Sequence, residues 1–336
     1  MKRRPAFPNS PSTVHAQRGV AVIMALLLTT LAITIVASLF WQQQVQVRLI
    51  ENQRLQLQKQ WILRGALDWA SLILREDAKY SSVDTLDEPW SVPLAETRLD
   101  QYVEDDKTDS DIADTSLEGS ISDAQARFNL TNLCPNGTIA PAAVATFERL
   151  LSLLHIDPAL AQSTAKLMTL IAPTTASSPP LNTSVPQSIT ESAQLQKQNP
   201  NTPQTMGYTQ MEDMLAVPGW SPALLDKLKP YVIFLPRSTT ININTASAEV
   251  IAALLSLSLA DANTLVASRK TASFRDLADA SSRLPNNTFI SANNTSISSN
   301  YFLVNGKVRM NRARLDMQTL IERNSGVTTL LWIREF

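Results

Sequence analysis

The hydrophobic and polar positions divide the first part of the chain into two stretches of different character. Residues 20–40 carry no charged side chain and are mostly apolar. A helix over this stretch spans about 32 Å, which matches the ~30 Å hydrocarbon core of a bilayer. Residues 41–79 contain no proline and are rich in Gln, Leu, Arg and Glu, which favour a helix. The pattern therefore predicts one continuous helix over residues 20–79, whose first half crosses a membrane.

The second half of that helix is amphipathic. Apolar residues recur every three or four positions, while Arg54, Arg64, Asp68 and Arg75 fall outside the stripe. A single apolar face on an otherwise polar helix indicates that this half packs on a globular domain. The predicted buried stripe consists of Ile62, Ala66, Trp69 or Ala70, and Ile73.

The end of the chain follows the two-residue period of β-strands. Apolar and polar residues alternate in three segments, and Asn324-Ser325-Gly326 is a typical hairpin turn between the last two. Residues 118–133 hold a further segment of strand length. The apolar face of these strands needs a cover, and the amphipathic helix supplies one. The sequence thus predicts an α+β fold in which one long helix lies on an antiparallel sheet.

Residues 134–285, between the first and the last strands, are predicted to be helical. Helices are expected to begin at Ala140-Pro141, Asp157-Pro158 and Ser221-Pro222, because a proline suits the first helical position. Thr245 is the predicted N-cap of a later helix. We therefore expect a large α-helical domain inserted into the helix-and-sheet domain.

Only positive charges precede the apolar run: Lys2, Arg3, Arg4 and Arg18. This predicts a single-pass membrane protein with a cytoplasmic N-terminus and its bulk on the other side of the membrane. A cleaved secretory signal is disfavoured because the apolar run is long and continues as a helix, whereas an uncleaved signal anchor remains an alternative. A basic leader that ends in Gly19, followed at once by an apolar helix, resembles the class III signal of type IV pilins and type II secretion pseudopilins. The resemblance implies that a prepilin peptidase cuts after Gly19 and methylates the new amine of Val20.

One position departs from the usual pilin pattern. Major pilins carry Glu at the fifth residue after the cut, where this chain has Met24. In those filaments the Glu of an incoming subunit is thought to neutralise the N-terminal amine of the subunit already in place, because an unpaired amine is costly in lipid. A subunit without this Glu can receive the contact but cannot make it. Met24 therefore suggests a first subunit, at the tip of the filament.

The segment FNLTNL narrows the resemblance to one family. Its residues Phe128, Asn129, Leu130 and Asn132 are close to the F-N-L-N-x-L of protein K, a minor pseudopilin of type II secretion systems. Two later segments resemble the paired SAM-like, helix-hairpin-helix units of that family: one has its turn at Gly219, and the other opens with Asn242, Asn244 and Thr245.

The resemblance to protein K implies a pilin fold and a place in the type II secretion pseudopilus, with the apolar helix in the bacterial inner membrane and the bulk of the chain in the periplasm. The implied partners are the minor pseudopilins I and J, other pseudopilins, the prepilin peptidase and secreted cargo. The bulky insert should cap the filament and start its growth. The expected domains are a leader (1–19), a transmembrane half-helix (20–40), the first part of the pilin domain (41–133), two SAM-like units (134–236 and 241–285) within an insert (134–285), and the last strands (286–336).

A second function class, a membrane-anchored DNA-binding protein, follows from the same helix-hairpin-helix signature. DNA-binding hairpins use glycine so that backbone N–H groups can approach the phosphates, whereas this chain has Leu257-Ser258-Leu259-Ala260 there. Arg269, Lys270 and Arg275 are the basic residues nearby, too few for strong binding to phosphates. The net charge of −1 also argues against a nucleic-acid partner. We therefore interpret the motif as a packing scaffold.

The candidate chemistry of the chain is limited. Acidic residues gather in 100–118 and could coordinate calcium, but they do not match the EF-hand spacing, and a solvated loop is the preferred interpretation. The acidic segments that protein K carries as a presumed cation site are missing, so we expect no metal or other cofactor, with calcium as the alternative.

Cys134 is the single cysteine and has no disulfide partner in the chain. His155, the one histidine after the leader, is predicted to lie in a core or interface, and no catalytic motif is present, so we predict no enzyme activity.

Overall fold

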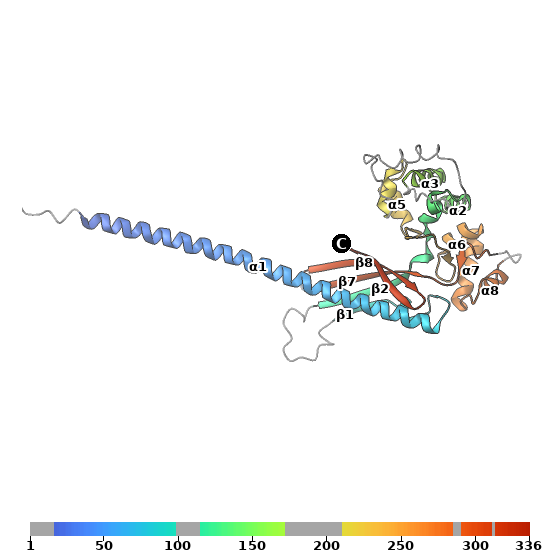
Figure 1. The fold of residues 1–336 in the computed structure, drawn as a ribbon, viewed down its shortest axis with the longest axis horizontal. Helices are drawn as coiled ribbons and strands as arrows, with labels where there is room; N and C mark the ends of the chain where they lie inside the picture. Colours follow the sequence, from blue (N-terminus) through green and yellow to red (C-terminus); the bar gives the residue numbers. More distant parts are fainter. Residues whose placement is uncertain (1–16, 99–114, 172–209, 285–289, 311–312) are drawn as a thin grey trace, which may run out of the picture. The chain divides into compact units, whose positions relative to one another are not determined.

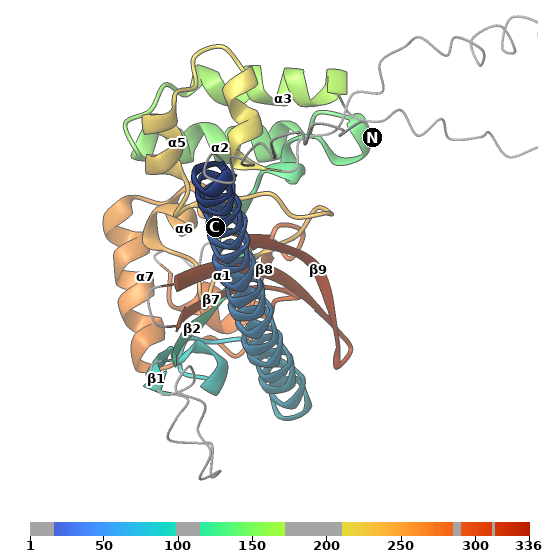
Figure 2. The same ribbon diagram turned by 90° about the vertical axis from the view of Figure 1, so that its left-hand side faces the viewer.

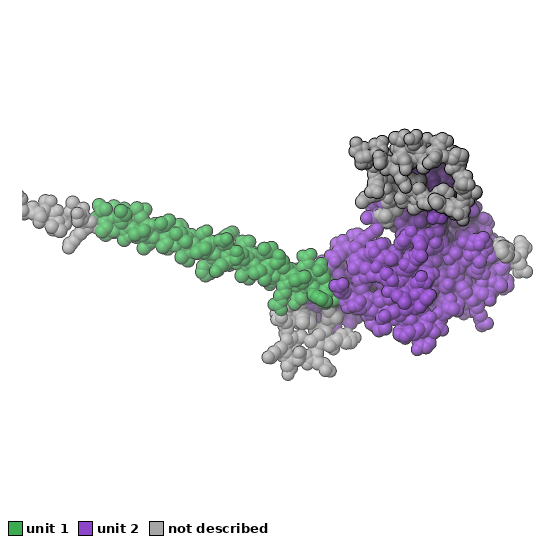
Figure 3. All heavy atoms as spheres, in the orientation of Figure 1, with its two compact units in different colours: residues 1–62 green, residues 63–336 purple. Residues whose placement is uncertain are grey.

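The computed structural model describes residues 17–98, 115–171, 210–284, 290–310 and 313–336. The chain divides into two compact units, residues 1–62 and 63–336, shown in green and purple in Figure 3. The predicted acidic loop at 100–114 lies outside the described residues.

The N-terminal helix is continuous, as the sequence predicts. Helix α1 runs from Gln17 to Tyr80 and crosses the boundary between the two units. Its first part is long and apolar enough to cross a membrane. Its last part is amphipathic, but the buried stripe consists of Leu63, Leu67, Ala70 and Leu74. Of the predicted positions, Ala70, which was the alternative to Trp69, is buried. Ile62, Ala66 and Ile73 are only partly buried and Trp69 is exposed, so the rest of the predicted stripe was displaced by about one residue.

The second unit contains an antiparallel sheet with the strand order β1-β2-β7-β8-β9 (Figure 1). The three C-terminal strands and the hairpin turn at Ser325-Gly326 confirm the predicted pattern. The segment 118–133 was only partly predicted correctly, because strand β2 ends at Asp123 and two short helical turns and a two-residue strand follow. The five strands are β1 (Leu94–Arg98), β2 (Thr115–Asp123), β7 (Tyr301–Met310), β8 (Ala313–Asn324) and β9 (Val327–Glu335).

The two faces of the sheet pack against different parts of the chain. Helix α1 covers one face (Figure 2), and it comes so close at Gly306 that a Cβ atom there would lie 3.3 Å from Leu63 Cδ2. The other face forms an apolar cluster in which Leu303 and Leu320 contact Ala124 and Ile233. The α+β prediction of a long helix on an antiparallel sheet is thus confirmed.

The chain between Asp123 and Tyr301 departs from the sheet between two strands that are hydrogen-bonded neighbours. We call residues 124–300 the helical segment. Its described α-helices are α2 (Pro141–Leu153), α3 (Ala159–Ile171), α5 (Pro222–Leu228), α6 (Ala248–Leu255), α7 (Leu259–Thr271) and α8 (Leu277–Ser282). Its 3-10 turns are η3 (Ala124–Ala126), η4 (Leu130–Leu133), η5 (Pro135–Gly137) and η7 (Met211–Ala216), and a further turn, η1 (Pro89–Ser91), precedes β1. Short parallel pairs join β3 (Phe128–Asn129) to β4 (Val232–Ile233) and β5 (Ile241–Asn242) to β6 (Thr295–Ser296).

One hydrophobic core holds the helical segment together. Phe147 of α2 stacks between Phe128 and Trp220, with ring centroids 5.4 and 6.5 Å away. Helices α2 and α5 begin at the predicted Pro141 and Pro222, and α3 begins at Ala159, one residue after the predicted Pro158. The Ser221 hydroxyl accepts a hydrogen bond from the backbone N–H of Leu224. The helical segment therefore has an apolar core that is separate from the cluster on the sheet.

Candidate functional site

The predicted processing site lies near the start of α1. Gly19, Val20 and Met24 are helical and exposed, with Met24 60% accessible to solvent. The apolar side chains that follow them are also exposed along the first unit. Such a surface suits lipid or the apolar helices of other subunits.

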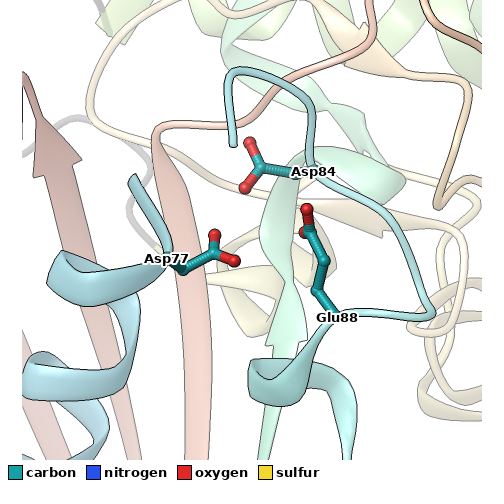
Figure 4. A group of neighbouring side chains, drawn as sticks. All are labelled: Asp77, Asp84 and Glu88. Atoms are coloured by element: carbon teal, nitrogen blue, oxygen red, sulfur yellow. The ribbon is translucent and has the colours of Figure 1, made fainter. Parts of the chain in front are cut away.

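A group of three carboxylates lies where α1 ends. Asp77 comes from the last turn of α1, Asp84 from the following loop, and Glu88 from the residue before η1. Figure 4 shows the three side chains converging, and their ligand oxygens lie within 4.8 Å of one another. The guanidinium of Arg323, which β8 projects from the α1 face of the sheet, donates to Asp77 at 2.8 Å and also to Asp84.

The same guanidinium connects three elements. It donates to the backbone carbonyl of Leu74 at 3.3 Å and to that of Ser299 at 3.2 Å, and it lies 4.6 Å above the ring of Phe302. Arg323 is 8% exposed. The cluster therefore fastens the end of α1 to the loop that follows it and to the sheet.

Burial dominates the electrostatics of this cluster. Removal from water raises the pKa of Asp77 to about 6, although the hydrogen bond from Arg323 acts in the opposite direction. Burial also raises the pKa of Asp84, and the positive charge of Arg323 limits that rise. Ionising the Asp77 and Asp84 carboxyls is therefore costly, and Arg323 is the group that offsets part of this cost.

The donor set of this cluster is of the kind that calcium uses, but the protein itself supplies the opposing charge. Arg323 contacts two of the carboxylates, and Glu88 Oε2 accepts hydrogen bonds from Trp90 Nε1 at 2.8 Å and from the Thr85 N–H at 2.9 Å. Each of the three carboxylates therefore already accepts at least one hydrogen bond from a protein donor. The arrangement fits an internal salt bridge better than a cation site.

The asparagine side chains of the FNLTNL motif form hydrogen bonds with backbone groups distant in sequence. Asn129 is fully buried: its Nδ2 donates to the carbonyl of Arg237 at 2.7 Å, and its Oδ1 accepts from the N–H of Leu235 at 3.1 Å. Asn132 pairs with both backbone groups of Thr239, at 2.8 and 2.9 Å. Phe128 and Leu130 are buried in the core of the helical segment. The motif thus ties the start of this segment to the connection that leads out of β4.

Asn242 and Asn244 do the same for the second predicted unit. Asn244 pairs with the backbone carbonyl and N–H of Phe274, at 3.0 and 2.8 Å. The Asn242 amide donates to the Asp123 carboxylate at 3.0 Å and to the Asp84 carbonyl at 3.1 Å. The Asn244 amide thus supplies both hydrogen bonds that the backbone of Phe274 needs, and the Asn242 amide satisfies buried acceptors.

The prediction that Thr245 caps a helix was wrong. Ser247 is the N-cap of α6, because its hydroxyl accepts from the N–H of Val250. The Thr245 hydroxyl instead donates to Asp123 Oδ2 at 2.5 Å, and Ser299 donates to the same oxygen at 2.6 Å. Complete burial raises the pKa of Asp123 to about 6, and these hydroxyl donors limit the rise.

Gly219 occupies the tight turn between η7 and α5. Its φ of +102° lies in the region that favours glycine, and a Cβ atom there would lie 2.6 Å from Leu160 Cδ2. The residue therefore permits both the turn and the close approach of α3.

One of the three basic residues on which DNA binding would depend is not available at the surface. Arg269 is 7% exposed, and its guanidinium donates to the carbonyl of Ile243 at 2.5 Å. Burial lowers its pKa to about 10. Lys270 and Arg275 are exposed. An arginine committed to the core cannot contact a phosphate, so the hairpin lacks the basic surface that such binding requires.

The remaining candidates for chemistry are isolated. His155 is exposed and adopts a φ of 53° in the turn after α2, so the core alternative was wrong, whereas the interface alternative stays a prediction. Cys134 is buried as a free thiol, and burial raises its pKa. Within the described residues, neither side chain has a hydrogen-bonding partner that would make it a base or a nucleophile.

Two family models match the chain, both described as type II secretion system protein K. The first matches residues 126–237 and the second residues 241–298, and together they cover half of the chain. Protein K of Pseudomonas aeruginosa is 25% identical over 92% of this chain and 90% of its own length. Protein K of Klebsiella pneumoniae is 29% identical over 79% of this chain and 78% of its own length.

The fold also has a solved counterpart. A chain in the crystal structure of the GspK–GspI–GspJ complex from the type 2 secretion system of enterotoxigenic Escherichia coli matches with a TM-score of 0.63. The two sequences are 23% identical, and the match covers 85% of this chain and 98% of that chain. The long helix, the sheet and the segment between its strands thus form an architecture seen in a protein of known structure.

Proposed function

Since the chain belongs to the type II secretion system protein K family, we propose that it is a minor pseudopilin that caps and initiates the pseudopilus. The observation that carries the proposal is the large helical segment between β2 and β7, in the region that the family models match. A pilin-type subunit stacks its apolar helix against other helices. A subunit with this much additional mass has little room for another subunit above it, so the tip is the position that suits it.

The proposed partners are the minor pseudopilins I and J of the same organism. The solved structure that shares this fold is named as a complex of GspK, GspI and GspJ. The exposed apolar side chains of α1, including Val20 and Met24, are a suitable contact surface for helices of partner subunits in the inner membrane. Tip assembly in turn would support the export of folded proteins across the outer membrane.

Processing after Gly19 can be tested with a matched control. Both Gly19 and Gly65 lie in α1, and a Cβ atom at either position would have no neighbour within 4 Å. We expect Gly19→Leu to remain an uncleaved precursor in cells with a prepilin peptidase, and Gly65→Leu to be processed to a methylated Val20. Mass spectrometry of the membrane-extracted protein measures both. A normal N-terminus in the Gly19 variant would contradict the processing site.

Tip placement requires a separate test. The proposal expects this chain, tagged at its C-terminus, to co-purify with minor pseudopilins I and J when all are expressed together. It also expects the Met24→Glu variant to cross-link to subunits of the filament shaft more often than the wild type does. Failure to recover I and J would contradict the proposed assembly. Unchanged cross-linking of the Met24 variant would show that the helical segment alone keeps the subunit out of the shaft.

A further inference from the structure

A cavity of about 550 Å³ lies on the face of the sheet that α1 does not cover. Its volume falls within the ~300–1,000 Å³ range of typical ligand sites. The helical segment and the last strands both contribute to its wall, so residues far apart in sequence meet there. The side chains that decide its chemistry are Arg127, Ile233, Phe234, Leu303, Trp332 and Arg334. We call it the Arg127 cavity.

Arg127 is the unusual group in this wall. It follows η3 and is partly buried, and burial lowers the pKa of its guanidinium. Within the part of the chain that the structure describes, its side chain makes no hydrogen bond or ion pair. The carboxylate whose charge acts on it is Asp123, which already accepts hydrogen bonds from Thr245 and Ser299. A cation removed from water without a counter-ion favours the arrival of an anion.

The other side chains that line the cavity determine which kind of anion fits it. Lys229 pairs with Glu212 at 3.3 Å and with Asp226 at 3.1 Å, so its charge is already balanced by carboxylates of the chain. The guanidinium of Arg334 lies 4.3 Å above the ring of Trp332 and adds positive charge beside an aromatic surface. Most of the exposed wall is apolar. The cavity therefore offers positive charge next to surfaces that suit an aliphatic or aromatic side chain.

We propose that the Arg127 cavity binds an acidic peptide segment of a partner protein, with a carboxylate on the Arg127 guanidinium and a neighbouring apolar side chain against Leu303 and Trp332. A bare inorganic anion would leave the apolar wall in contact with water, whereas a nonpolar peptide would leave Arg127 without a counter-ion. A carboxylate beside an apolar side chain satisfies both parts of the wall. This binding activity does not depend on tip placement.

The test uses the full chain in detergent micelles and fluorescein-labelled peptides, with binding followed by fluorescence anisotropy. The acidic probe is Ser-Gly-Asp-Phe-Asp-Leu with an amidated C-terminus. The second peptide has Asn in place of both Asp residues, and the third has these Asn residues and a free C-terminal carboxylate. The protein variants are Arg127→Gln, the charge reversal Arg127→Glu, and Arg309→Gln as a control. Arg309 is an exposed arginine that pairs with Glu96 on the sheet.

We expect the acidic probe to bind, to weaken as salt is added, and to lose at least about tenfold in affinity in Arg127→Gln, because a charge-assisted hydrogen bond is lost. Arg309→Gln should bind like the wild type. In Arg127→Glu a peptide with Lys in place of Asp should bind better than the acidic probe, which shows that the variant is folded. The third peptide tests which carboxylate is recognised. If it binds as tightly as the acidic probe, a terminal carboxylate is sufficient; if it binds like the amide peptide, the Asp side chains are required. Equal binding of the acidic and amide peptides, or equal losses in the Arg127 and Arg309 variants, would overturn the proposal.

Discussion

The buried Arg323 gives the sharpest test of how α1 is attached to the sheet. Replacing it with glutamine keeps a polar side chain of moderate length but removes the positive charge. Asp77 and Asp84 would then be buried with Glu88 nearby, and no cation would contact them. The carbonyls of Leu74 and Ser299 would each lose a donor.

The expected loss can be worked from these contacts. Removing one partner of a buried ion pair typically costs about 3–5 kcal/mol, because an uncompensated charge is left behind. Arg323 serves two carboxylates and is 8% exposed, so the upper half of that range applies. Arg309→Gln is the matched control, since its pair with Glu96 is exposed on both sides. Such a surface pair contributes about 0–1 kcal/mol.

The effect must also depend on pH in a defined direction. A carboxyl group whose pKa is higher in the folded chain than in the unfolded chain binds its proton preferentially when folded. Its contribution to the free energy of unfolding therefore rises as the pH falls from above 6 towards 4. In the wild type the pKa of Asp77 is raised to about 6, with Arg323 opposing the rise. Without Arg323 the pKa of Asp77 rises further, so the variant gains more from acid than the wild type does.

The size of this additional gain in the free energy of unfolding follows from the pKa difference. Each pKa unit corresponds to about 1.4 kcal/mol. The deficit of Arg323→Gln relative to the wild type should therefore shrink by about 1–2 kcal/mol between pH 7 and pH 5. Urea unfolding of the full chain in detergent, followed by near-ultraviolet circular dichroism, measures both values. EDTA in the buffer keeps divalent ions from replacing the guanidinium. A deficit no larger than that of Arg309→Gln, or one that grows at pH 5, would refute the reasoning.

Two further substitutions test the polar contacts and the turn in the helical segment. Asn129→Ala should lower the free energy of unfolding by about 3 kcal/mol, because buried backbone groups lose their partners, while the exposed Asn263→Ala should change it little; equal unfolding midpoints in urea would show that water replaces the amide. Gly219→Ala should cost at least about 1–2 kcal/mol because of its positive φ and its contact with Leu160. Gly65→Ala, in the open middle of α1, should instead be neutral or stabilising, and thermal unfolding that ranks the two glycine variants the other way would contradict the assigned backbone strain.

The elements that depend on local pattern could be predicted from the sequence. The uninterrupted helix, the three last strands and the turn at Ser325-Gly326 follow from periodicity and turn chemistry, and the structure has all of them. The stripe on α1 was placed about one residue away because a leucine directly follows each of the predicted residues Ile62, Ala66 and Ile73. Leu63, Leu67 and Leu74 have the same spacing as the residues chosen. Periodicity fixes the spacing of a buried face, but the choice between two adjacent faces depends on what packs against it.

The polar contacts could not be predicted in the same way. Arg323 lies on the same face of β8 as Thr319 and Ile321, but residues 319–321 are all buried, so alternation along the strand does not single out the buried arginine. Its partners are more than 200 positions earlier in the chain, and no local pattern connects them. Thr245 shows the same limit, because a hydroxyl before a helix is a reasonable cap until the fold brings Asp123 closer to it than the helix N-terminus.

These polar contacts share a place in the fold. The core of the helical segment and the apolar cluster on the sheet are separate, and the buried Asp123 and Asn242 lie where the two parts meet. Apolar contact is non-directional, so it would hold the two parts together without fixing their angle, whereas hydrogen bonds are directional. Asp123 accepts from Gln125, Thr245 and Ser299, and Asn242 links it to the backbone at Asp84. A network of this kind sets one orientation of the helical segment on the sheet, and the proposed tip placement would depend on that orientation more than on the area buried.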